Sequence, residues 1–234
     1  MNLLALLVLL FSGLSSAQGF DMSTYALCFQ NHAPELRSYG PLGRLGAKKG
    51  VCQGVSGIVS AFKENAVFNP GVQAQGPREA KSLLREVLDL YSHASPKKVT
   101  VNGYANLQEF CRARRELFLK TAIAFNASIA LHEITPLLPQ FWSMKGRPIV
   151  GEGERLRLHR TVERLRRSLA EGRWPLLLYY SHVVTVFSLE AHPEGVLLGV
   201  YDSNMLAPVS YLVRYTQDLP SEGQRMLWEI TPKR

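Results

Sequence analysis

Apolar side chains recur at helical spacing through the first two thirds of the chain. Val55, Val59 and Phe62 are separated by three or four positions, the spacing of residues on one helix face. This pattern predicts a helix over Cys52–Asn65, with Cys52 in its first turn. The same argument predicts three further helices, over Arg78–Tyr91, Asn106–Phe125 and Glu154–Ala170.

The pattern changes after Trp174, where short apolar runs alternate with turn residues. The connections Glu190–Gly195 and Leu219–Gly223 are short and polar, with Pro and Gly, which favours antiparallel pairing of neighbouring strands. Helices followed by strands predict an α+β fold in which an N-terminal helical half packs on a C-terminal antiparallel sheet. The predicted strands are Leu176–Leu189, Val196–Tyr201, Val209–Tyr215 and Met226–Ile230.

Three other segments carry turn residues and little periodicity. Phe20–Lys49 is rich in Pro and Gly and is expected to be a loop with at most one short helix. Asn65–Gly76 and Ser92–Gly103 are expected to be irregular connectors between helices.

The N-terminus has the pattern of a secretory signal peptide. An apolar run over Leu3–Phe11 is followed by small residues, and Ser15 and Ala17 suit cleavage before Gln18. Residues 1–17 are therefore predicted to be a signal peptide and residues 18–234 one exported domain, periplasmic or secreted, without an integral membrane segment. The alternative is a buried N-terminal helix, because Met1-Asn2 lacks the usual positive charge.

The formal net charge is +8, and the excess is concentrated in Arg112, Arg114, Arg115 and the segment Arg155–Arg173. These arginines are expected to be solvated helix faces, although the basic helix could bind an acidic envelope partner. No nucleic-acid-binding motif is present, so nucleic acid is not expected as a partner. The histidines lack metal-ligand spacing, and no metal or other cofactor is expected.

Three cysteines, Cys28, Cys52 and Cys111, leave at least one thiol outside any intramolecular disulfide, and the sequence does not choose among the three pairings. A thiol in the first turn of a helix has a lowered pKa, which makes Cys52 a candidate nucleophile. Gly50 and Gly54 would let the backbone approach a substrate carbonyl. The alternative is that Cys52 is a small buried apolar residue.

A second group of polar residues lies in the predicted sheet. His182 begins one strand, and Asp202 and Asn204 follow the next. Antiparallel pairing brings these positions to one edge, where Asp202 or Asn204 could orient the imidazole of His182.

Together these segments resemble papain-like cysteine peptidases, in particular bacterial exported branches. The motif Gly-Val-Cys-Gln-Gly-Val-Ser at residues 50–56 is similar to the segment that carries the nucleophile in that family, and Ser-His-Val-Val at residues 181–184 is similar to its histidine strand. Tyr-Asp-Ser-Asn at residues 201–204 is similar to the turn that follows. The resemblance implies a thiol peptidase or related acyl-transfer hydrolase that acts on a peptide or protein, with Cys52 as nucleophile, His182 as general base and acid, and Asp202 as orienting residue. An amine acceptor in place of water, as in transglutaminase-like enzymes, is not excluded.

The chain departs from the family pattern at two places. The Gln that usually precedes the nucleophile by about six residues is absent, and so is the aromatic residue that commonly follows it. The candidate substitutes for the missing donor are Gln53, Gln30, Asn31 and Lys49. The absent Gln keeps a second hypothesis open, a catalytically inactive papain-like domain that binds a peptide or an envelope polymer.

Overall fold

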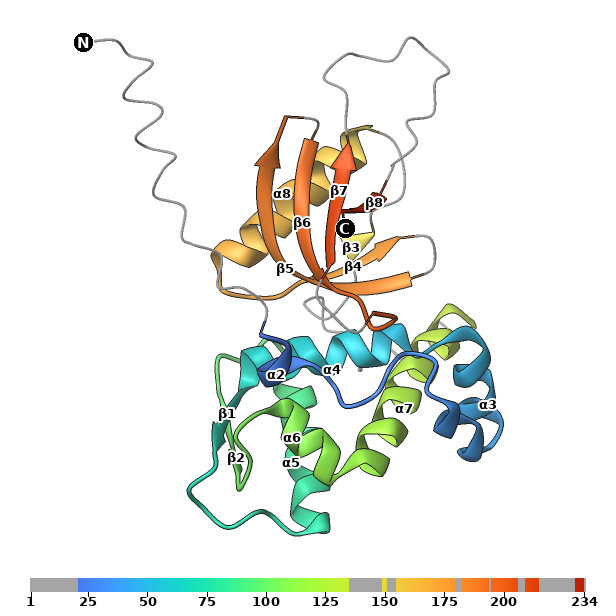
Figure 1. Ribbon diagram of the computed structural model, residues 1–234, viewed down its shortest axis with the longest axis vertical. Helices are drawn as coiled ribbons and strands as arrows, with labels where there is room; N and C mark the ends of the chain where they lie inside the picture. Colours follow the sequence, from blue (N-terminus) through green and yellow to red (C-terminus); the bar gives the residue numbers. More distant parts are fainter. Residues whose placement is uncertain are drawn as a thin grey trace, which may run out of the picture.

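The computed structural model describes residues 21–134, 149–150, 155–179, 182–193, 195–205, 209–214 and 230–233. Residues 1–17, the predicted signal peptide, lie outside this range. A helical half and a sheet half lie one against the other (Figure 1), so the fold is of the mixed α+β class. The helices are α2 (Met22–Tyr25), the 3-10 helix η1 (Pro34–Ser38), α3 (Gly40–Lys49), α4 (Cys52–Asn65), α5 (Pro77–Ser92), α6 (Leu107–Ala113), α7 (Arg115–Ile134) and α8 (Arg155–Ala170).

Helical periodicity located the main helices correctly. The predictions for α4, α5 and α8 are confirmed to within about one residue at each described end. The predicted helix over Asn106–Phe125 is wrong in two respects. It is interrupted at Arg114 (φ −129°, ψ 36°) and so forms α6 and α7, and α7 continues past Phe125 to Ile134. At the interruption the Arg114 side chain donates to the carbonyl oxygen of Gln75 at 2.7 Å, a long-range contact that periodicity cannot reveal.

Two segments predicted to be irregular contain short regular elements. Strands β1 (Ala66–Asn69) and β2 (Val99–Asn102) pair in parallel within the expected connectors. Apolar and polar residues alternate in β2 (Val-Thr-Val-Asn), but the run is at the short limit for a strand and lies among polar, Pro- and Gly-bearing residues, which favoured a connector. The expected loop over residues 20–49 contains α2, η1 and α3. The three glycines of α3 lower its intrinsic helix propensity, which hid it from the sequence pattern.

The second sheet has six strands in sequential order. Strand β3 pairs with β4 in parallel, and all other neighbours are antiparallel, so the expected meander of β5, β6 and β7 is confirmed. The single strand predicted over residues 176–189 is a hairpin instead, in which Tyr179 pairs with His182. Residues 215–229, with the predicted turn Leu219–Gly223, lie outside the described range. The strands are β3 (Ile149–Val150), β4 (Leu176–Tyr179), β5 (His182–His192), β6 (Gly195–Tyr201), β7 (Val209–Arg214) and β8 (Ile230–Lys233).

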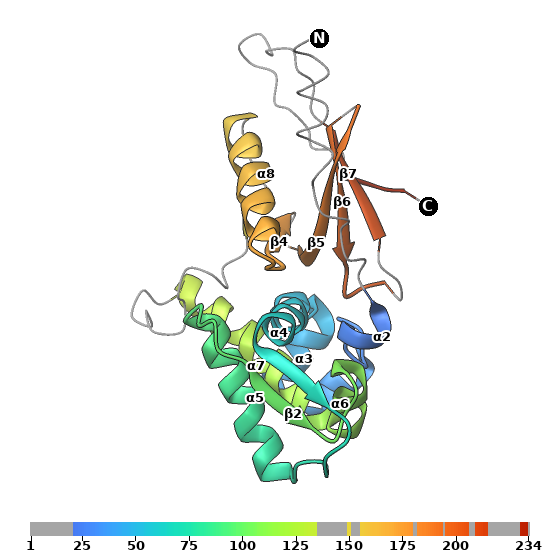
Figure 2. The same ribbon diagram turned by 90° about the vertical axis from the view of Figure 1, so that its left-hand side faces the viewer.

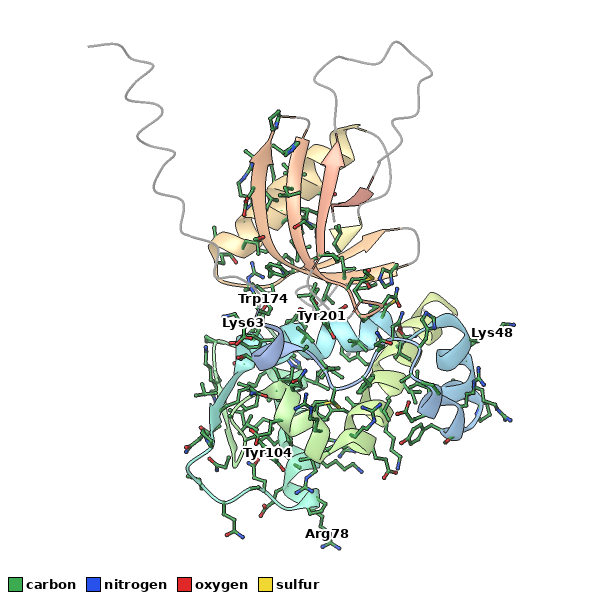
Figure 3. The ribbon with its side chains drawn as sticks, in the orientation of Figure 1. Lys48, Lys63, Arg78, Tyr104, Trp174 and Tyr201 are labelled. Atoms are coloured by element: carbon green, nitrogen blue, oxygen red, sulfur yellow. A yellow bond between two sulfur atoms is a disulfide. The ribbon has the colours of Figure 1, made fainter. Side chains whose placement is uncertain are left out.

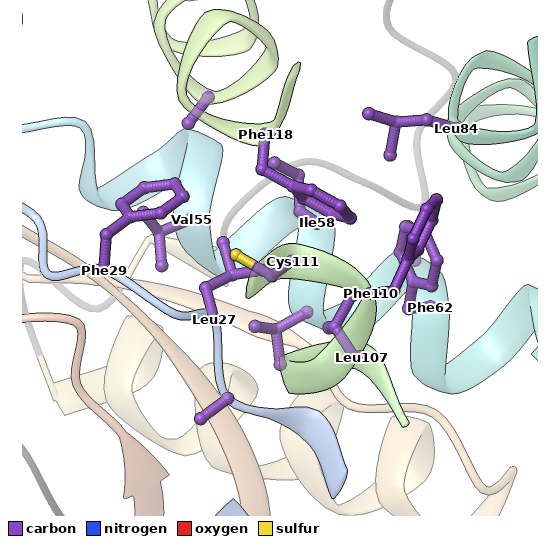
Figure 4. Close-up of a cluster of buried hydrophobic side chains, with 14 of the residues drawn as sticks. Leu27, Phe29, Val55, Ile58, Phe62, Leu84, Leu107, Phe110, Cys111 and Phe118 are labelled. Atoms are coloured by element: carbon purple, nitrogen blue, oxygen red, sulfur yellow. The ribbon is translucent and has the colours of Figure 1, made fainter. Parts of the chain in front are cut away.

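Each half has its own hydrophobic cluster. In the helical half, the Phe62 ring packs on Phe110 and Phe118 with ring centroids 6.0 and 5.9 Å apart (Figure 4). In the sheet half, α8 covers one face of the sheet (Figure 2) and buries Val162 and Leu165 against the strands. At the boundary between the halves lie Lys63, Trp174 and Tyr201 (Figure 3), and the Lys63 ammonium is 5.3 Å from the Trp174 ring.

Helix α4 forms the upper surface of the helical half and contacts β5 of the sheet half (Figure 1). It is buried on nearly every side, since it also packs on α5 and α7. Small residues make this possible: Ser56 and Ser60 are fully buried, and Gly54 and Gly57 face α7. The N-terminus of α4 therefore lies at the junction of the two halves.

Candidate functional site

Cys52 is the first residue of α4 and the free cysteine of the chain. The structure answers the pairing question, because Cys28 and Cys111 form a disulfide and Cys52 does not take part in one. Cys52 is 8% exposed as a residue and packs beside Leu176 of β4 and Val183 of β5. The thiol therefore faces the sheet half from the start of a helix.

His182 and Asp202 meet at one edge of the sheet, as the sequence predicts. Antiparallel pairing of Thr185 with Tyr201 brings the start of β5 beside the end of β6. Nε2 of His182 lies 2.8 Å from Oδ1 of Asp202, and the two side chains are 17% and 6% exposed. The same Oδ1 accepts the backbone N–H of Asn204 at 2.8 Å, which holds the carboxylate toward the imidazole.

The Cys52 thiol and the His182 imidazole interact, and each shifts the pKa of the other. Burial by itself would raise the pKa of Cys52, but the bonds to His182 and to the backbone of Val183 outweigh burial, and the pKa is lowered overall. For His182, burial works toward a lower pKa and is outweighed by the bonds to Asp202 and Cys52, which raise the pKa to about 9. These opposite shifts favour a thiolate beside an imidazolium.

Two buried hydrogen bonds hold α4 against β5 one helical turn after Cys52. Oγ of Ser56 donates to the carbonyl oxygen of Val183 at 3.2 Å, and Oγ1 of Thr185 donates to the carbonyl oxygen of Ser56 at 3.3 Å. Because Val183 follows His182 directly, this reciprocal pair fixes the distance between the thiol and the imidazole. Sequence reasoning missed both residues, since neither side chain carries a pattern that indicates its partner.

The two glycines around Cys52 have roles other than the expected one. Gly54 lies against the backbone of Ala122 in α7, where a Cβ atom would meet the carbonyl oxygen, so it permits close helix packing. Gly50 has φ +87°, and a Cβ atom at this position would meet the carboxamide of Asn31. The expectation that both glycines open the backbone to a substrate is therefore corrected: they are needed for packing and for the turn into α4.

Asn31 connects the thiol segment to the histidine segment. Its side chain is almost completely buried, and its Oδ1 accepts the backbone N–H of Val51, the residue before Cys52. Its Nδ2 donates to Oδ1 of Asn204 at 2.9 Å, and its backbone N–H donates to the carbonyl oxygen of Ser203 at 3.0 Å. The sequence suggested Asn31 as an oxyanion donor, but in the structure its side-chain amide is bonded to Val51 and Asn204.

The structure describes two of the other three candidate oxyanion donors. Gln30 is exposed, and the side chain of Lys49 lies outside the described residues. Gln53 is buried in α4, and its backbone forms a hydrogen bond with the Cys52 thiol. The backbone N–H of Cys52 remains as a donor, because amides of a first helical turn have no acceptor within the helix and Val51 contributes no side-chain cap.

Asn204 also reaches the imidazole. Its Nδ2 lies 3.3 Å from Nε2 of His182, so Asp202 and Asn204 approach the same ring nitrogen. The Nδ1 atom is then the one that can exchange a proton with the thiol. The alternatives that the sequence left open, Asp202 or Asn204, are both in contact with His182.

Within the described residues, no three His, Cys, Asp or Glu side chains are grouped as metal ligands. The same residues contain no helix that is both long enough and apolar enough to cross a bilayer.

No protein-family model, no curated protein and no solved structure matches this chain.

Proposed function

We propose that this protein is an exported thiol peptidase, or a related amide hydrolase, of the papain-like class. The observation that carries the proposal is the grouping of a thiol at a helix N-terminus, an imidazole whose pKa is coupled to that thiol, and a carboxylate 2.8 Å from Nε2 of the imidazole. Such an arrangement supplies a nucleophile, a proton carrier and an orienting group. The mixed α+β fold and the three sequence motifs support the same class.

The chemistry would proceed in two balanced steps. The Cys52 thiolate attacks the amide carbonyl, the C–S bond forms, and the C–N bond breaks as His182 delivers its proton to the leaving amine. Neutral His182 then takes a proton from water, whose oxygen attacks the thioester and releases the carboxylic acid and the thiolate. The backbone N–H of Cys52 is placed to stabilise the oxyanion in both steps.

The low exposure of Cys52 favours one competing proposal. Because only 8% of the residue is accessible, a substrate carbonyl would need room that Leu176 and Val183 partly occupy. A papain-like domain that binds a peptide or an envelope polymer without cleaving it would tolerate such a buried thiol. The two proposals differ in whether the thiol reacts and turns over.

Thiol reactivity and amide hydrolysis separate these proposals in one set of variants. The full chain would be treated with iodoacetamide at pH 7, the labelled cysteine mapped by mass spectrometry, and cleavage of a peptide library followed in parallel. Cys52→Ala should abolish both signals, and His182→Ala should lower the hydrolysis rate by about 100-fold or more.

His93→Ala is the matched control. His93 also pairs with an aspartate, Asp89, but at 3.4 Å and in an exposed position on α5, so its replacement should leave both signals unchanged. Cys52 labelling no faster than that of a free thiol would contradict the proposal. A fast-reacting thiol without hydrolysis of any library member would favour the binding domain.

A further inference from the structure

The contacts of Asn31 and Asn204 have a fixed direction. The backbone N–H of Val51 can only donate, so the Asn31 atom that meets it is the acceptor Oδ1. The Nδ2 atom of Asn31 therefore faces Asn204, and its partner there is Oδ1 at 2.9 Å. The remaining Asn204 atom, Nδ2, then faces Nε2 of His182 at 3.3 Å.

Asn204 thus has the opposite effect to Asp202 on the same nitrogen. Oδ1 of Asp202 is a negative acceptor and favours a proton on Nε2. The amide N–H group of Asn204 has its positive end toward Nε2 and disfavours that proton. An imidazole held by the carboxylate alone would keep its proton more tightly and would deliver it less readily to a leaving amine.

We propose that Asn31 and Asn204 are positioning residues that form a directional amide relay from the backbone of Val51 to His182 and offset the effect of Asp202. Val51 precedes Cys52, so the relay also ties the start of the thiol helix to the histidine edge of the sheet. Asn31 influences His182 without touching it, because it sets which end of the Asn204 amide faces the ring. This inference deepens the proposed function, and only its meaning for proton delivery rests on that function.

Among the residues that the structure describes, Cys52, Asp202 and His32 are titratable groups near His182 or the relay. Cys52 approaches from α4, Asp202 approaches from the turn after β6, and His32 lies in the loop before η1 with its Nε2 3.5 Å from Nδ2 of Asn31. In a Cys52→Ala protein the thiol no longer titrates together with His182. The titration of His182 can then be followed by NMR on its ring Cε1–H signal, assigned through a His182→Ala variant.

In that Cys52→Ala protein, Asn204→Ala should raise the His182 pKa by about half to one unit, since one opposing dipole is lost. Asn31→Ala should produce a shift of the same sign, because an unrestrained Asn204 amide can turn and accept from Nε2–H. The double variant Asn31→Ala/Asn204→Ala should shift no further than Asn204→Ala alone. His32→Ala is the matched control, since it removes a neighbour of Asn31 outside the relay, and it should leave the pKa in place.

An unchanged or lowered His182 pKa in Asn204→Ala would overturn the relay, and so would additive shifts in the double variant. If the buried Asn31→Ala protein does not fold, the exposed Asn204 position still decides the question. The NMR readout needs no substrate. A failed relay with intact hydrolysis, or an intact relay without hydrolysis, therefore identifies which proposal is wrong.

Discussion

Gly54→Ala would test whether close packing of α4 on α7 supports the site. The added Cβ would lie 2.2 Å from the backbone carbonyl oxygen of Ala122, whereas real Cβ atoms stay beyond 3.0 Å. A backbone oxygen cannot turn aside as a side chain can, so the two helices must separate by roughly 1 Å. Cys52 begins the helix that moves.

The magnitude follows from two opposing effects. Overpacking of this kind costs up to about 3 kcal/mol. Replacing a helical Gly by Ala returns about 1 kcal/mol of helix propensity. The free energy of unfolding should therefore fall by about 2 kcal/mol, which lowers Tm by about 4–8 °C in a chain of this size. Displacement of Cys52 by about 1 Å should reduce hydrolysis by about 100-fold.

Gly57→Ala is the matched control on the same helix. Its added Cβ would meet Cε1 of the half-buried Phe125 ring at 2.7 Å, and a ring edge can shift where a backbone cannot. The propensity gain of about 1 kcal/mol is the same, and it should offset the cost of moving the ring, so the free energy of unfolding should change by close to zero. Urea unfolding with an unchanged m-value gives both stabilities, and iodoacetamide labelling of Cys52 reports on the site. If Gly54→Ala is as stable and as reactive as Gly57→Ala, helix packing is not what this glycine provides.

Two further predictions concern proton balance and the disulfide. Because the His182 pKa is raised to about 9, hydrolysis should decline as pH rises through about 9, and it should also decline on the acid side as the Cys52 thiolate is protonated. Asp202→Asn should move the alkaline decline of the hydrolysis rate to lower pH. An alkaline decline that stays at the same pH would argue against the carboxylate as the cause of the raised His182 pKa. The Cys28–Cys111 disulfide closes a loop with a sequence separation of 83, so the double variant Cys28→Ser/Cys111→Ser should lose about 2–4 kcal/mol of unfolding free energy. Urea unfolding curves of the unaltered chain that coincide with and without reductant would contradict this prediction.

The sequence was most informative where one residue type has one physical role. Val55, Val59 and Phe62 repeat at helical spacing because α4 buries them against one core, and this spacing located α4. The thiol, the imidazole and the carboxylate were found because a motif and a hairpin register place them. The structure brings together all three predicted residues.

Contacts between distant segments could not be predicted. The bond from Thr185 to Ser56 crosses 129 positions, and Asn31 meets Asn204 across 173, so neither leaves a periodic signal. Gly54 shows a different limit. A glycine that admits a substrate and a glycine that admits a neighbouring helix look the same in a sequence, and only the position of Ala122 distinguishes them.

The division of the site between the helical half and the sheet half has a consequence for timing. The disulfide and helix α4, which begins at the nucleophile, belong to the helical half, whereas His182 and Asp202 arrive with the sheet. Chains fold from the N-terminus as they emerge, so the helical half can form first. At that stage its thiol has no imidazole beside it and keeps the slow chemistry of an ordinary cysteine. Under the proposed function, a newly made chain would gain an activated thiol only once β5 and β6 have formed.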